Sequence, residues 1–334
     1  MTHSDGAGLT LGLCVLGCGD FAATFARSIM ELRGEIDLYF ASRDLSKARD
    51  YTARFNGIDA FGDYAAAAAA PRVDAVYVCT PHHLHLEHVA LAASEGKHAL
   101  VEKPIAATLD DAQAMIRLAD SAGVTLMVAE NWRFHPAMLE TKRLVEAGRL
   151  GQVRLIQLQE QYPFQPTGWR TRAEFNGGGV LIDGGIHKVS ALSHLGGRPS
   201  RIYAHEVPSA QPGLEGEDGV VVMTQTDDGV VGIINHSWCV APIRPHSWVS
   251  ISGTTASLYF ERGQPQLKLV DADSETLVHL DNYPGGFVPM VREFHSSIRE
   301  GRQPSMSGAE GAADLALVLA AYESMESGRP VIFG

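Results

Sequence analysis

Residues 97–105 read KHALVEKPI, a short apolar run that ends abruptly in a charged pair and a proline. Apolar runs of this length between chain-breaking residues are typical of buried strands in a parallel sheet. In open α/β sheets, ligands bind in the crevice beyond the carboxyl ends of the strands. Glu102 and Lys103 stand at that end, where burial and a partner charge can tune a lysine for proton transfer. Taken alone, the tripeptide Glu102-Lys103-Pro104 favours a simpler interpretation, in which Pro104 ends the strand and the charged pair is solvated.

Toward the N-terminus, an apolar run over residues 9–16 ends in GCGDFA, and a helical pattern follows over residues 21–32. A strand, a glycine turn and a helix with the spacing G-x-G-x-x-A are the pattern of a dinucleotide-binding unit. Gly17 permits the tight turn, Gly19 lets the backbone approach a pyrophosphate, and Ala22 is small enough for close helix packing. The predicted cofactor contacts from this turn are Gly17, Cys18, Gly19, Asp20, Phe21 and Ala22.

The strand predicted over residues 36–41 ends in Ser42, Arg43 and Asp44. A site that prefers NAD usually places an acid here, where it binds the ribose hydroxyls. Ser42 and Arg43 offer a hydroxyl and a planar cationic fork instead, and these suit a 2′-phosphate. Asp44 is better placed to cap the next helix. The sequence therefore favours NADP over NAD, and a solvated Arg43 at a helix start is the alternative.

Polar residues also follow the strand predicted over residues 73–79, which ends in TPHHLH. The spacing of His85 and His88 raises the question of metal ligation. No carboxylate stands at a fitting spacing, so we expect no metal site here and favour polar groups beside a cofactor. The further predicted cofactor contacts are Thr80, Pro81, His82, His85, Glu102, Lys103, Asn131 and Arg170.

Bulk composition excludes several classes of partner. The chain has 334 residues, of which 45% are hydrophobic and 20% charged, as in ordinary soluble proteins. A net charge of −12 argues against nucleic acid or an anionic membrane, because binding phosphates needs basic patches. The four cysteines lack zinc spacing, and we expect them to be reduced in a cytoplasmic protein. Neither a signal peptide in residues 1–10 nor a membrane-spanning run is predicted.

The rhythm of predicted elements changes along the chain. Up to about residue 130, strands alternate with helices, which predicts an α/β domain with a doubly wound parallel sheet. Beyond residue 150, strand-like segments lie close together between turns, which suggests a largely antiparallel sheet. We predict two domains: residues 1–130 bind the dinucleotide, and residues 131–334 form an α+β domain for substrate binding and oligomerisation.

Residues 177–187 read GGGVLIDGGIH. If the segment from residue 180 is helical, Asp183 and His187 are four residues apart and share one face. The preceding glycines would let a substrate or cofactor approach the helix start closely. The alternative is an Asp–His pair that only stabilises the helix.

A loop rich in proline, glycine and aromatic residues precedes this segment. Within it, Tyr162, Trp169 and Arg170 are candidates for the wall of a site for substrate and nicotinamide. For Trp169, packing in the core is an equal alternative.

Together these motifs resemble the Gfo/Idh/MocA family of oxidoreductases. The resemblance implies an N-terminal Rossmann domain, a C-terminal domain with a large open sheet, and assembly into homodimers or homotetramers. Sugars, polyols or related cyclic alcohols are the implied substrates, and Lys103, Asp183 and His187 the implied catalytic group. The matching segments run in family order over nearly the whole chain: residues 17–22, 80–81 with His85, 96–98, 102–104, 133–136, 177–187, 322–324 and 328–331.

Two positions depart from the family pattern. Ser190 stands where many members have Asp, and His82 where many have Asn. Neither change touches Lys103 or His187, so the departures concern the identity of the substrate.

Hydride transfer from a secondary alcohol needs a base for the hydroxyl proton and a donor that stabilises the developing oxyanion. His187 is our choice for proton transfer, because histidine titrates near neutral pH. Lys103 would bind the reacting oxygen with Glu102 orienting it, and stays an alternative acid/base. Asp183 would fix the substrate or His187.

Three other functions stay open on the sequence alone. Reduction of a dicarbonyl, or oxidation of a dihydrodiol, would use the same residues. A redox-assisted glycoside hydrolase or lyase would keep its cofactor tightly bound and cause no net change in nicotinamide absorbance. A non-catalytic dinucleotide sensor would not need the set Lys103, Asp183 and His187.

Overall fold

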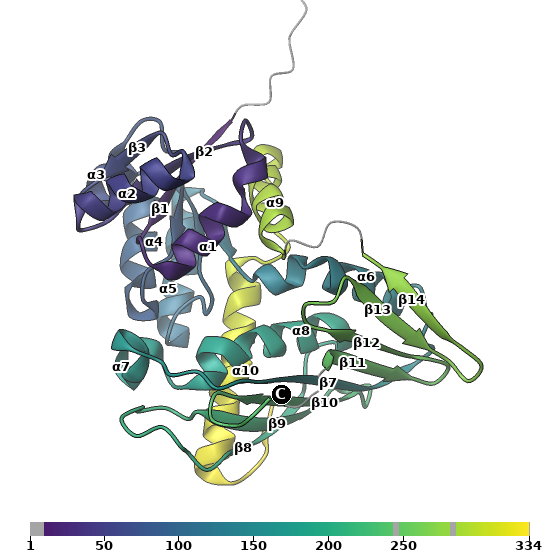
Figure 1. Ribbon diagram of the computed structural model, residues 1–334. Coiled ribbons are helices and arrows are strands. Elements are labelled where there is room, and N and C mark those ends of the chain that lie inside the picture. Colours follow the sequence, from purple (N-terminus) through teal and green to yellow (C-terminus); the bar gives the residue numbers. More distant parts are fainter. Residues whose placement is uncertain (1–9, 243–246, 281–284, 334) are drawn as a thin grey trace, which may run out of the picture. The chain divides into compact units, whose positions relative to one another are not determined.

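The computed structural model describes residues 10–242, 247–280 and 285–333 (Figure 1). Most of the N-terminal stretch for which we expect no signal peptide, residues 1–9, lies outside the described residues. The chain divides into two compact units. The N-terminal unit comprises residues 1–105, 110–129 and 287–309, and the C-terminal unit comprises residues 106–109, 130–286 and 310–334.

The N-terminal unit is built on a six-stranded sheet in the order β3-β2-β1-β4-β5-β6. All neighbouring strands run parallel, and β1 and β4 are buried along their whole length, as the apolar runs predict. The strand order reverses between β1 and β4, where ligands bind in sheets of this kind. The strands are β1 (Leu11–Leu16), β2 (Ile36–Ala41), β3 (Asp59–Phe61), β4 (Ala75–Val78), β5 (His98–Val101) and β6 (Leu126–Val128).

Helices cover both faces of this sheet (Figure 1). On one face α1 and α9 pack together, with the rings of Phe25 and Phe287 6.0 Å apart. The helices are α1 (Asp20–Ser28), η1 (Met30–Leu32), α2 (Leu45–Phe55), α3 (Tyr64–Ala69), η2 (His82–Leu84), α4 (His85–Ser94), α5 (Leu109–Ala122) and α9 (Phe287–Glu300).

The C-terminal unit contains a nine-stranded sheet in the order β14-β13-β12-β11-β7-β10-β9-β8-β15. Its neighbours are antiparallel except for β7 and β10, so the predicted, largely antiparallel sheet is confirmed. The strands are β7 (Val153–Gln161), β8 (Arg201–Glu206), β9 (Gly219–Gln225), β10 (Val231–Ser237), β11 (Ser247–Gly253), β12 (Ser257–Glu261), β13 (Gln266–Val270), β14 (Glu275–His279) and β15 (Val331–Ile332).

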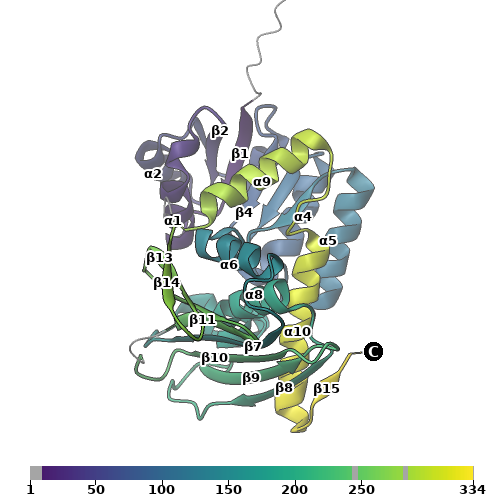
Figure 2. The ribbon, with the colours of Figure 1, turned by 90° about the vertical axis from the view of Figure 1, so that its right-hand side faces the viewer.

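One face of this sheet is covered by helices, with α8 over the sheet and α6 packed beside it (Figure 2). Side chains on β9 alternate: Val220 and Val222 are buried, whereas Val221 and Met223 are exposed on the opposite face. The helices are η3 (Asn131–Phe134), α6 (Pro136–Glu146), η4 (Gly168–Thr171), α7 (Ala173–Asn176), the π-helix η5 (Leu181–Gly185), α8 (Ile186–Gly196) and α10 (Gly308–Ser327).

Two predicted helices differ in detail. The helix expected over residues 21–32 ends at Ser28, and the short η1 follows it. The helix expected from residue 180 begins with a π-helical turn before α8. Among the described helices, none has the length and apolar character needed to cross a membrane.

Candidate active site

The glycine turn after β1 has the geometry that a dinucleotide needs. Gly17 has a φ of +106°, and a Cβ there would lie 2.6 Å from the carbonyl oxygen of Cys79. A Cβ on Gly19 would meet nothing within 4 Å, so the backbone at the start of α1 lies open. Ala22 is fully buried, which explains the small residue at the third position. These residues fit a pyrophosphate bound at the helix N-terminus, with Cys18, Asp20 and Phe21 in the same turn.

The residues after β2 have separate tasks. Asp44 caps α2 by accepting the backbone N–H of Ser46 at 2.9 Å, which confirms the predicted cap. Ser42 is nearly buried, and its hydroxyl accepts the backbone N–H of Asp44 at 3.2 Å. Arg43 is exposed. Burial lowers the pKa of His88, and the charge of Arg43 lowers it further, so Arg43 and His88 lie near one another.

His85 connects the segments that follow β4 and β5. Its Nδ1 lies 3.1 Å from the carbonyl oxygens of both Pro104 and Ile105, and its Nε2 lies 3.0 Å from that of Thr80. The ring is fully buried, and this burial lowers its pKa to about 4. A side chain without exposed surface contributes to a cofactor site only through the segments that it holds. His82 and Thr80 are nearly as buried, and Pro81 precedes η2.

Glu102 fixes the backbone at the predicted catalytic lysine. Its buried carboxylate accepts the backbone N–H of Lys103 at 3.2 Å and the hydroxyl of Tyr77. Burial, and then the charge of Glu102, raises the pKa of Tyr77 far above its usual range. Lys103 is half-buried and follows the carboxyl end of β5, the position that the sequence predicts.

In the C-terminal unit, Asp183 lies in a cluster with three residues predicted to wall the site. The Nε of Arg170 donates to Oδ2 of Asp183 at 3.0 Å, and the Arg170 guanidinium lies 4.6 Å from the centre of the Trp169 ring. Burial raises the pKa of Tyr162, and the nearby charge of Asp183 also raises it. The indole N–H of Trp238 donates to the Tyr162 hydroxyl at 3.2 Å. The structure thus brings Tyr162, Trp169, Arg170 and Asp183 together.

His187 has a carboxylate partner that sequence reasoning missed. Its Nδ1 lies 2.7 Å from Oε1 and 2.8 Å from Oε2 of Glu130. Glu130 is 1% exposed, and His187 keeps part of its ring accessible. Glu130 lies two residues beyond the end of β6, and none of the motifs in the sequence contains it. Asn131, a predicted cofactor contact, is the next residue and opens η3.

The glycines before this helix do not serve the purpose that the sequence suggested. A Cβ on Gly178 would lie 2.3 Å from the Tyr322 hydroxyl oxygen, and one on Gly179 would lie 2.0 Å from the Glu217 carbonyl oxygen. The glycines therefore admit the protein's own side chain and backbone, and the expectation that they admit substrate or cofactor is corrected.

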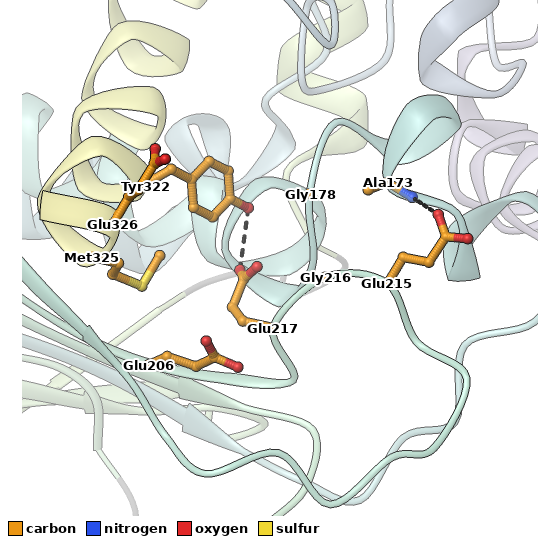
Figure 3. Close-up of a pocket in the computed structure, with 9 residues that line it drawn as sticks. All are labelled: Ala173, Gly178, Glu206, Glu215, Gly216, Glu217, Tyr322, Met325 and Glu326. Carbon is orange, nitrogen blue, oxygen red and sulfur yellow. Dashed lines mark hydrogen bonds between the residues drawn. The ribbon is translucent and has the colours of Figure 1, made fainter.

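Glu217 caps the start of the helix that carries Asp183 and His187. It accepts the N–H groups of Gly179 at 3.0 Å and Leu181 at 2.7 Å. The Tyr322 hydroxyl also donates to it, at 3.1 Å (Figure 3). Burial raises the pKa of Glu217 to about 7, although these donors oppose the rise. The acidic cavity beside it, of about 340 Å³, also has Glu206, Glu215 and Glu326 in its wall.

Ser190, one of the two departures from the family pattern, belongs to a buried polar network. Its hydroxyl accepts from Nε of Arg133 at 3.1 Å, and Arg133 also donates to Glu310 at 3.1 Å. Asp314 lies close by, and its burial raises its pKa to about 7. Ser190 is 1% exposed.

In the described ranges, no group of three or more residues of the types His, Cys, Asp and Glu is arranged to hold a metal.

Comparison with known proteins gives a consistent picture. Residues 11–130 match the family described as "Oxidoreductase family, NAD-binding Rossmann fold", and residues 138–259 match the "GFO/IDH/MocA C-terminal domain". A 1,5-anhydro-D-fructose reductase from Ensifer adhaerens is 32% identical over 269 residues, which cover 78% of this chain and 79% of that protein. A D-apiose dehydrogenase from Paraburkholderia graminis is 26% identical over 332 residues, which cover 95% and 88%.

Solved structures share the whole fold. The crystal structure of an aldose-aldose oxidoreductase from Caulobacter crescentus, complexed with glycerol, superposes with a TM-score of 0.88 and 27% identity. The match covers 97% of this chain and 100% of that one.

Proposed function

This chain belongs to the Gfo/Idh/MocA family of NAD(P)-dependent oxidoreductases, and we propose that it transfers a hydride between a nicotinamide cofactor and a secondary alcohol or ketone of a sugar, polyol or related cyclic alcohol. The observation that carries this proposal is the cluster in the C-terminal unit. In this cluster the buried carboxylate of Glu130 holds His187. Four residues earlier, Asp183 is held by Arg170. The names of the curated relatives, a sugar reductase and a sugar dehydrogenase, support the substrate class.

The cofactor half of the site is assigned to the N-terminal unit. When bound, the nicotinamide supplies or accepts the hydride. The turn with the open backbone at Gly19 would hold the pyrophosphate, and the half-buried Lys103 would face the reacting end. Thr80, Pro81 and Glu102 are further proposed contacts from the same unit. Asn131 and Arg170, which belong to the C-terminal unit, are also proposed as cofactor contacts.

The protein's own groups would move the proton and stabilise charge. His187 exchanges a proton with the substrate hydroxyl, and Lys103 donates a hydrogen bond to the same oxygen as negative charge develops there. Asp183, held by Arg170, accepts from a neighbouring substrate hydroxyl, and Tyr162 and Trp169 wall the site. Pairs of polar groups aimed at adjacent hydroxyls are what recognition of a sugar requires.

We expect Arg43→Ala to weaken NADP(H) much more than NAD(H). Arg43 is exposed at the end of β2, beside the hydroxyl of Ser42, and is proposed to bind the 2′-phosphate. Loss of a charge-assisted contact costs about 1.5–3 kcal/mol, or roughly 10- to 100-fold in Kd. Fluorescence titration with each cofactor measures the effect. Arg49→Ala, an exposed arginine on α2, is the control, and an equal loss for both cofactors would show that Arg43 does not read the phosphate.

We also propose that the chain forms homodimers or homotetramers through the open face of the C-terminal sheet. Met223 is 50% exposed there and stands in register with Tyr203 and Ile233 on the neighbouring strands. Exposed apolar patches of this kind mark association surfaces. Met223→Glu is expected to shift the protein toward monomer in light scattering, whereas Met30→Glu in the N-terminal unit is not. A monomeric wild type at micromolar concentration would contradict this proposal.

We also propose a cytoplasmic location. It is supported by the cysteines, which form no disulfide in the part of the chain described.

A panel of aldoses, ketoses and polyols, tested with NAD and NADP and followed by nicotinamide absorbance, tests the proposed reaction. A substrate-dependent change in absorbance is expected. Product formed without any net change would point to the redox-assisted lyase or hydrolase instead. A cofactor that binds while no substrate turns over would point to a sensor.

A further inference from the structure

We propose that Glu130 is a positioning residue that fixes the tautomer and orientation of His187, so that Nε2 is the nitrogen that exchanges the proton. This inference rests on the proposed function, because it assigns the geometry of the proton-transfer residue. It deepens that function by naming a carboxylate that none of the motifs contains.

The contact between the two side chains determines where the ring proton sits. The Nδ1 of His187 lies within 2.8 Å of both Glu130 oxygens. An ionised carboxylate only accepts hydrogen bonds, so Nδ1 must carry the hydrogen. In the neutral imidazole the lone pair is then on Nε2, which is the form that a general base requires. When Nε2 takes up a proton, the buried carboxylate stabilises the imidazolium that forms.

Glu130 is itself held by the segment that follows it, and that segment is anchored in the core. Its Oε1 accepts the backbone N–H of Trp132 at 3.1 Å, so the carboxylate caps η3. The Trp132 ring stacks on Trp248 with centroids 4.3 Å apart, and Trp248 is fully buried. A carboxylate that is 1% exposed would be strongly destabilising without a charged or hydrogen-bonding partner. His187 meets that need.

The nearer acid in the sequence has another partner. Asp183 is four residues before His187, and it accepts from Nε of Arg170 at 3.0 Å. Reasoning from spacing alone would give Asp183 the task of orienting His187. The distances assign that task to Glu130, 57 residues away along the chain.

The test uses Glu130→Gln, which keeps the shape of the side chain and removes the charge. The ¹⁵N signals of the His187 ring, assigned by their loss in His187→Gln, should show Nδ1–H in the wild type. In Glu130→Gln we expect a shift toward the Nε2–H tautomer and a kcat lower by about 10- to 100-fold, with an unchanged Kd for the cofactor. Glu130→Asp should recover part of the rate. Glu310→Gln, a matched loss of charge beside Arg133 and Arg198, should leave the His187 signals unchanged.

Two results would overturn the inference. One is a wild-type His187 that carries its proton on Nε2. The other is a Glu130→Gln variant that matches Glu310→Gln in both kcat and ring signals. The tautomer measurement needs no substrate. Failure to find dehydrogenase activity would therefore count against the proposed function alone, and the role of Glu130 would still be decided by the ring signals.

Discussion

Replacing His187 by alanine is expected to lower turnover by about 10²- to 10⁴-fold while cofactor affinity stays nearly unchanged. The variant loses the imidazole that exchanges a proton with the substrate hydroxyl and keeps the glycine turn that would hold the pyrophosphate. It should also lose a rate-controlling ionisation near neutral pH, because the titrating group is gone. Steady-state kinetics across pH, with a separate cofactor titration, measure both effects.

His194→Ala is the matched control for that variant. His194 lies near the end of α8, and burial lowers its pKa to about 4, so it does not titrate near neutrality. An His187→Ala enzyme that keeps both its turnover and its pH profile would remove His187 from the reaction.

Lys103→Ala is expected to lower turnover by a comparable factor, about 10²- to 10³-fold, and to leave the ionisation near neutral pH in place. Its ammonium group stabilises the developing charge on the substrate oxygen and in this account does not exchange the proton. The same pH profiles test this division of labour. Lys97→Ala, four residues before β5 ends, is the control for loss of a lysine in the same segment.

The opposite pattern would reverse the two assignments. If the ionisation disappeared only in Lys103→Ala, the lysine would be the acid/base and His187 a positioning group, since a desolvated lysine can also titrate near neutrality. Unchanged turnover in both variants would remove the dehydrogenase function from this chain.

The parallel half of the fold was predictable because its strands are short apolar runs ended by glycine, proline or charge. The strand predicted over residues 36–41 is β2, and the one predicted over residues 73–79 contains β4. The three-residue β3 and the two-residue β15 are too short to give a periodic signal. The π-helical turn at residues 181–185 was also hidden, since the sequence shows only a helical spacing there.

The candidate site was predictable where one motif holds all the residues involved. Gly17 and Gly19 could be assigned different roles from their spacing. In the structure Gly17 has a positive φ, and the space beside the backbone of Gly19 is empty. The contacts of Glu130 and of Glu217 join residues far apart in the chain, and local pattern does not report such pairs. For the same reason the glycines at 178 and 179 were assigned to a ligand, when Tyr322 and Glu217 occupy that space.

Direct transfer of deuterium from the nicotinamide to the substrate would establish the proposed hydride transfer. Reduced NADP carrying deuterium at the transferable position of the nicotinamide is incubated with the protein and with ketoses and other carbonyl sugars, and the products are analysed by mass spectrometry. We expect a product with one deuterium on carbon, formed in step with oxidised cofactor and lost in the variant His187→Ala. Deuterium absent from every product, with the cofactor bound but unconsumed, would contradict it.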